Sequence, residues 1–275
     1  MIKLVVDSGS CLAKEYIKEN DITLVKFNLL VADKQIIEPD IENINDFYKL
    51  LEENKGVAKT SQPSVDSYES AFKYILNENN EVICICMASK LSGAYNCAEM
   101  VAKQINSDKI SVIDSHTLIQ GTKILVEEAV KLIKENKTRL EIVEHLNKLK
   151  SEIEINFIPQ SLEPLKRGGR IGTLSALLGS VLNIKPILKF KDNILTCYKK
   201  VMGMQKGIKD LISAIPATCK KIYAMCVYKS NFFQNLVSGL KAKHPHLEII
   251  EENVSPTVGI HVGISCIGIT FAPNK

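Results

Sequence analysis

The chain has 275 residues, of which 45% are hydrophobic and 24% are charged, and its formal net charge at pH 7 is +4. These values are ordinary for a soluble globular protein with one large domain or two smaller ones. The lysines are spread among acidic residues, which argues against a dedicated nucleic-acid binder. No apolar run approaches the roughly 20 residues that a membrane span needs.

The cysteines and the first residues of the chain bear on where in the cell the protein is found. None of the eight cysteines forms a CxxC pair, so the usual zinc spacing is absent and we expect no metal site. Cys84 and Cys86 lie in an apolar run, where we expect buried, reduced thiols on one face of a strand. The first residues, "MIKLVVDS", reach a charge too early for a signal peptide. Together these features predict a cytoplasmic protein.

In the first half of the chain, strand-like and helix-like stretches alternate. Short apolar strands separated by amphipathic helices indicate a parallel sheet that is covered on both faces. We expect extended segments at 2–8, 22–32, 81–89 and 110–115, and helices after Cys11 and at 43–54, 64–78, 92–105 and 117–135.

The second half has a different pattern, in which a hairpin and further strands are combined with helices near 204–214 and 230–243. This α+β pattern places a boundary near residue 155. We therefore predict a Rossmann-like α/β domain at 1–155 and an α+β domain at 156–275. After a helix at 138–152, we expect strands at 155–162, 221–229, 247–254 and 263–272, helices at 173–184, 204–214 and 230–243, and a hairpin at 186–201 that turns at Asp192-Asn193.

Three loops that follow predicted parallel strands are rich in hydroxyl groups. They are "DSGS" (7–10), "ASKLSGAY" (88–95) and "DSHT" (114–117). Ligands of open α/β sheets gather at such loops. None of the three is a GxGxxG motif, so a dinucleotide fingerprint is missing.

The stretch "KLSGAYN" is the most informative of these loops. Ser92 stands where a helix N-cap is expected, and Gly93 follows it. Free backbone N–H groups and the helix dipole make such a helix start a site for anions. Ordinary capping by a serine explains the same pattern.

The stretch "GVAKTSQPS" (56–64) only partly matches a nucleotide P-loop. Ala58 stands where that motif needs glycine, and Pro63 delays the next helix until about Ser64. We therefore reject a nucleotide site. What remains is an extended segment that presents the hydroxyl groups of Thr60 and Ser61 just before a helix.

Two further stretches contain basic side chains beside glycines. "LEPLKRGGRIG" (162–172) holds two of the three arginines of the chain, and the planar guanidinium of Arg170 fits carboxylate or phosphate groups. "VGIHVG" (258–263) places His261 between two glycines, where a purely structural histidine is the alternative. A hydrolase is disfavoured, because the chain has no GxSxG elbow and the neighbours Asp114, Ser115 and His116 point in different directions along a strand.

Seven of these stretches, taken together, resemble the DegV family of bacterial fatty-acid-binding proteins. They occur in the order of the family and span nearly the whole chain. One departure is visible, because "DSGSCLA" lacks the second acidic residue that family members usually carry after the serines. The matching stretches are "DSGS", "KTSQPS" (59–64), "SKLSGAYN" (89–96), "VIDS" (112–115), "LKRGGRIG" (165–172), "KPIL" (185–188) and "GIHVG" (259–263).

The resemblance implies a function in lipid binding and phospholipid metabolism. It implies two domains with a long-chain fatty acid buried between them, and a separate fatty acid kinase that phosphorylates the carboxyl group. It further implies no catalytic residue in this chain, no metal, and no cofactor other than the bound fatty acid. A further expectation is that Lys166 and Arg167 face outward and attract the kinase, an acyl phosphate or an anionic membrane surface, with a solvated basic turn as the alternative.

By the same resemblance, Thr60, Ser61 and Ser92 hold the carboxylate of the fatty acid, Gly93 lies at the helix start beside them, and Arg170 and His261 lie close to the head group. A carboxylate that is buried without such partners would be destabilised by several kcal/mol or more. The apolar stretch 171–188 is our candidate for part of the acyl-chain slot, and ordinary core is its alternative. Each buried methylene contributes about 0.8 kcal/mol.

The rival hypothesis is an enzyme that acts on a small acidic or phosphorylated metabolite in the same cleft. A protein that only scaffolds partners fits the hydroxyl- and glycine-rich loops poorly. The sequence shows no metal cluster, no nucleophile elbow and no nucleotide loop, which favours a carrier over an enzyme.

Overall fold

The computed structural model describes residues 1–31, 34–38, 44–54, 57–105, 108–177, 183–228 and 230–273. The chain forms two compact units. Unit 1 consists of Met1–Glu42 and Thr60–Ser151, and unit 2 consists of Asn43–Lys59 and Glu152–Lys275. Residues 43–59 thus belong with the second half of the chain, so the units are not the two continuous segments, 1–155 and 156–275, that we predicted. That the segments 1–155 and 156–275 form separate domains remains a prediction.

Unit 1 is built on a four-stranded sheet with the order β2-β1-β6-β7. Every neighbouring pair in it is parallel. The side chains of Val82–Cys86 in β6 are completely buried, which explains the continuous apolar run there. The strands are β1 (Ile2–Asp7), β2 (Thr23–Val25), β6 (Glu81–Cys86) and β7 (Ile110–Asp114).

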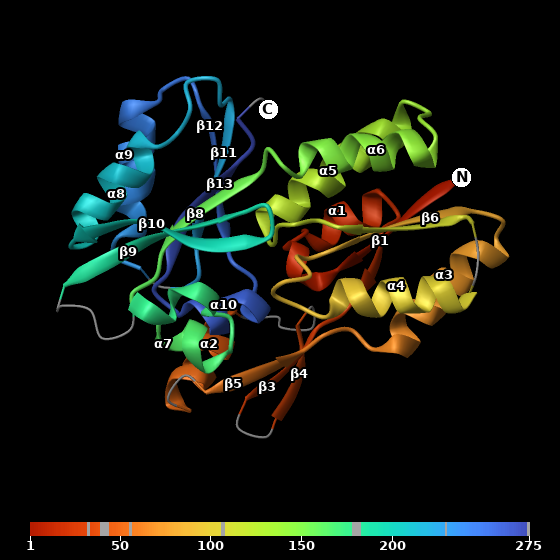
Figure 1. The fold of residues 1–275 in the computed structure, drawn as a ribbon, viewed down its shortest axis with the longest axis horizontal. Helices are drawn as coiled ribbons and strands as arrows, with labels where there is room; N and C mark the ends of the chain where they lie inside the picture. Colours follow the sequence, from red (N-terminus) through yellow and green to blue (C-terminus); the bar gives the residue numbers. More distant parts are fainter. Residues whose placement is uncertain are drawn as a thin grey trace. The chain divides into compact units, whose positions relative to one another are not determined.

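Helices cover both faces of this sheet, as predicted. In Figure 1, α3 and α4 lie on one face, and α5 and α6 lie on the other. Ser64 caps α3 by accepting a hydrogen bond from the Ser67 N–H at 3.2 Å. The helices of unit 1 are α1 (Lys14–Glu19), α3 (Val65–Asn77), α4 (Ala94–Ile105), α5 (Gln120–Lys134) and α6 (Arg139–Leu149).

A separate three-stranded sheet has the order β4-β3-β5. Its strands are β3 (Asn28–Val31), β4 (Lys34–Ile37) and β5 (Ala58–Ser61). The prediction of one extended run over 22–32 was wrong, because β2 and β3 belong to different sheets. The rejection of a P-loop is supported, because the helix after β5 begins only at Val65.

Unit 2 contains a six-stranded mixed sheet with the order β10-β9-β8-β13-β11-β12. Only β11 and β12 are parallel among its pairs, and the other neighbours are antiparallel. The predicted hairpin is confirmed, and Asp192 and Asn193 both have positive φ values at its turn, +51° and +65°. The strands are β8 (Glu154–Ile158), β9 (Ile184–Lys191), β10 (Ile194–Met202), β11 (Lys221–Cys226), β12 (Glu248–Asn253) and β13 (Ile267–Phe271).

Helices α8 and α9 cover one face of this sheet (Figure 1) and share a hydrophobic core with its strands. The sequence did not predict the short helices α7 and α10. The helix predicted at 173–184 was also wrong in part, because a 3-10 helix spans Gly172–Leu177, β9 already includes Ile184, and 178–182 lie outside the described residues. The helices of unit 2 are α2 (Ile44–Glu53), α7 (Glu163–Arg167), α8 (Met204–Ser213), α9 (Phe233–Lys243) and α10 (Pro256–Val262).

Candidate functional site

The loop after β1 is organised by the carboxylate of Asp7, which is completely buried. Its Oδ2 accepts a hydrogen bond from the Met87 N–H at 2.6 Å, and its Oδ1 accepts one from the Gly9 N–H at 3.1 Å. Burial raises the pKa of Asp7 to about 7, and the nearby charge of Glu38 adds to this rise. The Met87 and Gly9 amides oppose it. Asp7 therefore ties the loop after β1 to the loop after β6.

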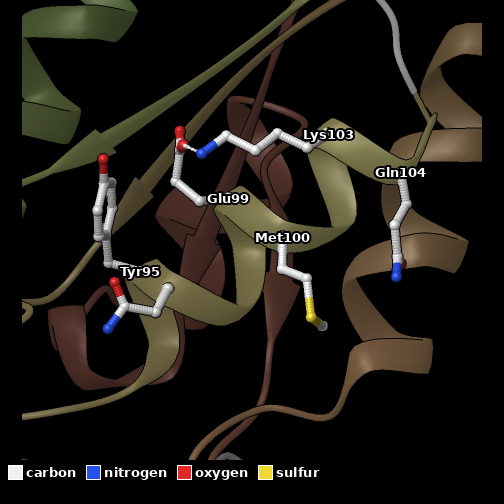
Figure 2. Close-up of a pocket in the computed structure, with 6 residues that line it drawn as sticks. Tyr95, Glu99, Met100, Lys103 and Gln104 are labelled. Carbon is white, nitrogen blue, oxygen red and sulfur yellow. Dashed lines mark ion pairs between the residues drawn. The ribbon is translucent and has the colours of Figure 1, made fainter.

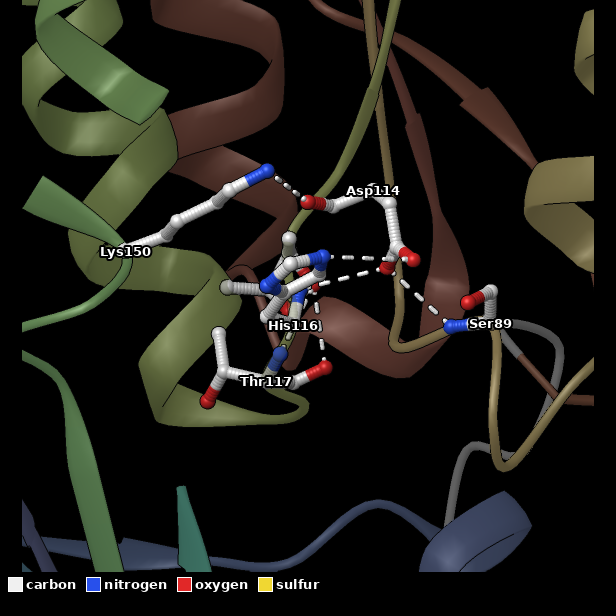
Figure 3. Close-up of polar contacts among 7 residues, drawn as sticks. Ser89, Asp114, His116, Thr117 and Lys150 are labelled. Carbon is white, nitrogen blue, oxygen red and sulfur yellow. Dashed lines mark hydrogen bonds and ion pairs between the residues drawn. The ribbon is translucent and has the colours of Figure 1, made fainter. Parts of the chain in front are cut away.

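A second aspartate, Asp114, holds the loop after β6 from the other side (Figure 3). Its Oδ1 accepts hydrogen bonds from the Ser89 N–H at 3.1 Å and from the His116 N–H at 3.2 Å. The Ala88 N–H also donates to the Thr117 carbonyl at 2.8 Å. The ammonium group of Lys150 donates to the backbone carbonyl of Asp114 at 3.0 Å.

The third connection joins the loops after β7 and β1, because the Ile119 N–H donates to the Gly9 carbonyl at 3.1 Å. Ile119 has a φ of +47°, a strained conformation for a β-branched residue. All three hydroxyl-rich loops expected at the carboxyl end of the parallel sheet are thus tied to one another.

The four predicted ligand residues of unit 1 lie on two of its segments. Helix α4 begins at Ala94, so Gly93, and not Ser92, directly precedes it, which corrects the expected cap by one position. The Ser92 hydroxyl nevertheless accepts a hydrogen bond from the Ala94 N–H at 3.2 Å, and its own hydrogen can still be donated.

Thr60 and Ser61 end β5, and the residue that follows them reaches the start of α4. A Cβ atom on Gly93 would lie 1.9 Å from Oε1 of Gln62, so a larger residue at position 93 would displace the end of this side chain. Thr60 and Ser92 are half-buried, and Ser61 is exposed. The sequence analysis did not identify Gln62, because its contact with Gly93 joins residues that are distant in the sequence.

In unit 2, the double glycine ends helix α7. The Arg170 N–H donates to the Leu165 carbonyl at 2.9 Å, and the Gly169 N–H donates to the Lys166 carbonyl at 3.0 Å. This pair of bonds, with Gly169 at a φ of +72°, is a Schellman motif. The guanidinium of Arg170 folds back to donate to the Gly168 carbonyl. The tight turn thus fixes the backbone and the side chain of Arg170.

His261 lies in α10 and packs against the same turn. A Cβ atom on Gly168 would lie 2.2 Å from Nδ1 of His261, so Gly168 leaves space for the imidazole. Burial, together with the positive charge of Arg170, lowers the pKa of His261 to about 4. The imidazole is therefore neutral at pH 7, with one nitrogen as a donor and the other as an acceptor.

The six predicted ligand residues thus form two sets. Thr60, Ser61, Ser92 and Gly93 belong to unit 1, and Arg170 and His261 belong to unit 2. Sequence reasoning missed Asp7 and Asp114, although each ends a parallel strand and precedes a serine, a repeated "DS" that the sequence displays.

Two pockets within unit 1 lie away from these sets. One, of about 540 Å³, runs along the outer face of α4 and is lined by residues of that helix, among them Tyr95, Met100 and the ion pair Glu99–Lys103 (Figure 2). The other, of about 450 Å³, is lined by side chains of β2 and α3 and by neighbouring residues such as Ile37. Because a single helix face cannot enclose a ligand, the first pocket is not a candidate acyl slot.

The described part of the candidate acyl slot 171–188 contains both buried and exposed residues. Leu174, Ile187 and Leu188 are buried, whereas Thr173 and Ser175 are exposed. Ile187 belongs to the core beneath α8 and α9, which favours ordinary core for that residue. Among the described residues, no group of three or more histidine, cysteine or acidic side chains can hold a metal ion. Across the same residues, no helix has the length and apolar character of a membrane span.

Comparisons with known proteins agree with this fold. A family model described as "Uncharacterised protein, DegV family" matches residues 1–274. A DegV domain-containing protein of Clostridium acetobutylicum is 30% identical over 281 residues, which cover 98% of either chain.

Two solved structures have the same fold. A DegV family protein from Thermus thermophilus, described as binding fatty acid, matches with a TM-score of 0.88 at 24% identity over 98% of this chain and 99% of its own. A stearic-acid-binding protein from Eubacterium ventriosum matches with a TM-score of 0.85 at 23% identity over 100% of this chain and 99% of its own. The predicted α/β class, with a parallel sheet and a second mixed sheet, is confirmed.

Proposed function

Because this chain belongs to the DegV family, we propose that it binds a long-chain fatty acid and presents the carboxylate to a separate kinase for phosphorylation. The observation that carries the proposal is the pair of donor sets, built from hydroxyl groups and a helix start in unit 1 and from a cation and a neutral imidazole in unit 2. The structural relatives that are described as binding fatty acid or stearic acid support the choice of ligand.

The chemistry of the two sets suits a carboxylate. The Ser92 hydroxyl and the backbone N–H groups at the start of α4 are donors, and the helix dipole adds partial positive charge. Arg170 offers the charge, and the neutral imidazole of His261 is a hydrogen-bonding group that adds no second charge. We propose Thr60, Ser61 and Gly93, with Ser92, as carboxylate ligands in unit 1, and Arg170 and His261 as head-group ligands in unit 2.

The proposed role is that of a carrier rather than an enzyme. In this role Arg170 stabilises the negative charge that accumulates as a phosphoryl group reaches the carboxylate, while the nucleotide is held by the kinase. Lys166 and Arg167 are exposed on α7 and are proposed to attract the kinase or, transiently, an anionic membrane surface. The eight cysteines are all free thiols, which supports a place in the reducing cytoplasm.

Mass spectrometry tests the ligand directly. We expect native mass spectra of protein purified from bacterial cells to show about one long-chain fatty acid per chain, and the organic extract to identify it. Added oleate or palmitate should fill any ligand-free fraction. Ligand-free protein that takes up neither acid would contradict the proposal and would favour the alternative of an enzyme for a small acidic or phosphorylated metabolite.

A further inference from the structure

The loop after β6 consists of residues Met87–Gly93. Its first residue is held by a carboxylate whose two oxygens each accept one hydrogen bond. Asp7 accepts the Met87 N–H with one oxygen and the Gly9 N–H with the other. A carboxamide cannot keep both bonds, because its nitrogen carries hydrogen and accepts none, and in a protonated carboxyl group one bond falls to the hydroxyl oxygen, a weaker acceptor. Both bonds are therefore strongest in the ionised form of Asp7.

A displacement at Met87 is passed along the loop to the ligand residues. The Leu91 and Ser92 N–H groups both donate to the Ala88 carbonyl, at 3.0 and 3.1 Å. These bonds make the loop a tight turn between Met87 and Ser92. The position of Met87 thus determines where Ser92 and the start of α4 present their donors.

Asp7 is surrounded by groups that disfavour its charge. Glu38 is nearly buried, accepts a hydrogen bond from the Ser8 hydroxyl at 2.7 Å, and repels the Asp7 carboxylate. Cys86 from β6 and Tyr68 from α3 also face Asp7, but burial and their neighbours raise the pKa of both groups, so they stay neutral at pH 7. Among these described neighbours, Glu38 is the titratable group that carries charge.

We infer that Asp7 is a positioning residue for the proposed fatty-acid site, whose ionised carboxylate holds Met87 and thereby aligns Ser92 and Gly93 with the ligand carboxylate. The inference rests on the proposed function. It makes the affinity for the head group depend on the ionisation of Asp7. Since the pKa of Asp7 is raised to about 7, the alignment is present above neutral pH and is lost as the pH falls.

Asp114 offers a matched comparison, because it holds the same loop by a different geometry. Its Oδ1 accepts both the Ser89 and the His116 N–H groups, and its Oδ2 lies 3.7 Å from Nε2 of His116, so an asparagine introduced at this position can keep both N–H bonds through its own carbonyl oxygen. The same aspartate-to-asparagine change should therefore affect the loop strongly at position 7 and weakly at position 114. Asp192→Asn, at the exposed turn of the β9–β10 hairpin, serves as the neutral control.

The experiment measures the affinity of the full chain for a 16-carbon fatty acid with a fluorophore at its methyl end, between pH 5.5 and 8.5. Each variant is compared with the wild type at the same pH, so the titration of the ligand cancels. We expect Asp7→Asn to weaken binding about tenfold at pH 8.5 and little at pH 5.5. Glu38→Gln should move the loss of wild-type affinity to lower pH, because it removes the repelling charge. Asp114→Asn should change affinity less than threefold.

Two further measurements separate a positioning role from a general loss of stability. In the ligand-free protein, the amides of Met87–Gly93 should exchange hydrogen about tenfold faster in Asp7→Asn than in the wild type or in Asp114→Asn. In a Ser92→Ala background, Asp7→Asn should lose most of its effect on affinity. Equal exchange in the wild type and Asp7→Asn, or an undiminished affinity loss in the Ser92→Ala background, would overturn the inference.

The two proposals can fail separately. A wild-type chain that binds no fatty acid overturns the proposed function, whereas the exchange measurement still decides whether Asp7 holds the loop. If Asp7→Asn does not fold, Glu38→Gln decides the question, because an unchanged pH midpoint of affinity in that variant would contradict the role of Asp7.

Discussion

The imidazole of His261 occupies the space that a side chain at Gly168 would need, since its Nδ1 lies 2.2 Å from the position of a Cβ atom there. The neighbouring Gly169 has no atom within 4 Å of its Cβ position, but its φ of +72° favours glycine. The two glycines of "KRGGR" therefore have different structural roles. The first gives room to His261, a predicted ligand residue, and the second permits the turn that ends α7.

This difference predicts different effects of the same substitution. Gly168→Ala should displace His261 and shift its pKa from about 4 toward its ordinary value, because the ring loses its buried position. Gly169→Ala should leave that pKa unchanged and destabilise the fold by about 1–2 kcal/mol through backbone strain. A nuclear magnetic resonance titration of the imidazole and a denaturant titration measure the two effects. Identical imidazole titrations in the two variants would contradict the assignment.

The predicted hydroxyl ligands should discriminate between a carboxylate and its ester. Replacing both Ser92 and Thr60 by alanine should weaken binding of a fatty acid at least about tenfold more than binding of its methyl ester, because a hydrogen bond to a charged acceptor is worth roughly 1.5–3 kcal/mol. Fluorescence competition with the acid and the ester measures both affinities. Equal losses would show that these hydroxyl groups do not bind the carboxylate.

The lowered pKa of His261 predicts how stability depends on pH. The unfolded chain binds a proton at this residue below its ordinary pKa of 6.5, whereas the folded chain binds it only near 4. The contribution of the neutral imidazole is therefore present above pH 6.5 and is lost as the pH falls toward 4. The free energy of unfolding of the wild type, relative to His261→Gln, should drop by up to about 3 kcal/mol over this window, at about 1.4 kcal/mol per pKa unit. A constant difference would show that the imidazole is not buried.

The raised pKa of Asp7 predicts the opposite slope. The folded chain keeps this proton up to about pH 7, whereas the unfolded chain releases it near the ordinary value of 3.8. Stability contributed by the protonated form is thus lost as the pH rises from about 4 to 7. The free energy of unfolding of Asp7→Asn, measured with denaturant, should not show this loss. As the pH rises, the variant should therefore gain stability relative to the wild type. Parallel pH profiles of the two proteins would refute the shifted titration.

Arg170 should matter more for phosphoryl transfer than for retention of the fatty acid. Arg170→Ala removes the cation that we propose stabilises the growing charge, while the acyl chain should still hold the ligand. We expect at least about a hundredfold loss of acyl phosphate formation with the cognate kinase and ATP, consistent with the removal of one preorganised charge partner. The labelled fatty acid should remain bound, as gel filtration can show. Lys206→Ala, on the exposed face of α8, is the matched loss of a positive charge.

Acyl phosphate formation by this chain without a kinase would overturn the carrier role. Full kinase-dependent activity of Arg170→Ala would leave "LKRGGRIG" as a structural turn, since the Schellman motif depends on the backbone and on Gly169 rather than on the guanidinium.

The sequence by itself determined the features that depend on neighbours along the chain. The apolar run of β6, the start of α3 just after Pro63 and the Asp192-Asn193 turn each rest on contacts within a few residues, and all three are confirmed. The order of the family motifs also placed the six candidate ligand residues, because a motif is a local pattern.

Tertiary structure alone decided which distant segments share a unit. Helix α2 belongs to unit 2, where Tyr48 stacks on Tyr228 with 4.9 Å between the ring centroids and lies against Gly259. These two partners follow Tyr48 by about 180 to 210 positions in the chain. Asp7 likewise meets Met87 across 80 positions. Local periodicity sets which face of an element is apolar, but it does not specify the partner that covers that face. Burial and hydrogen bonding between distant segments select that partner, so the space left by Gly168 and the two bonds of Asp7 became visible only in the folded chain.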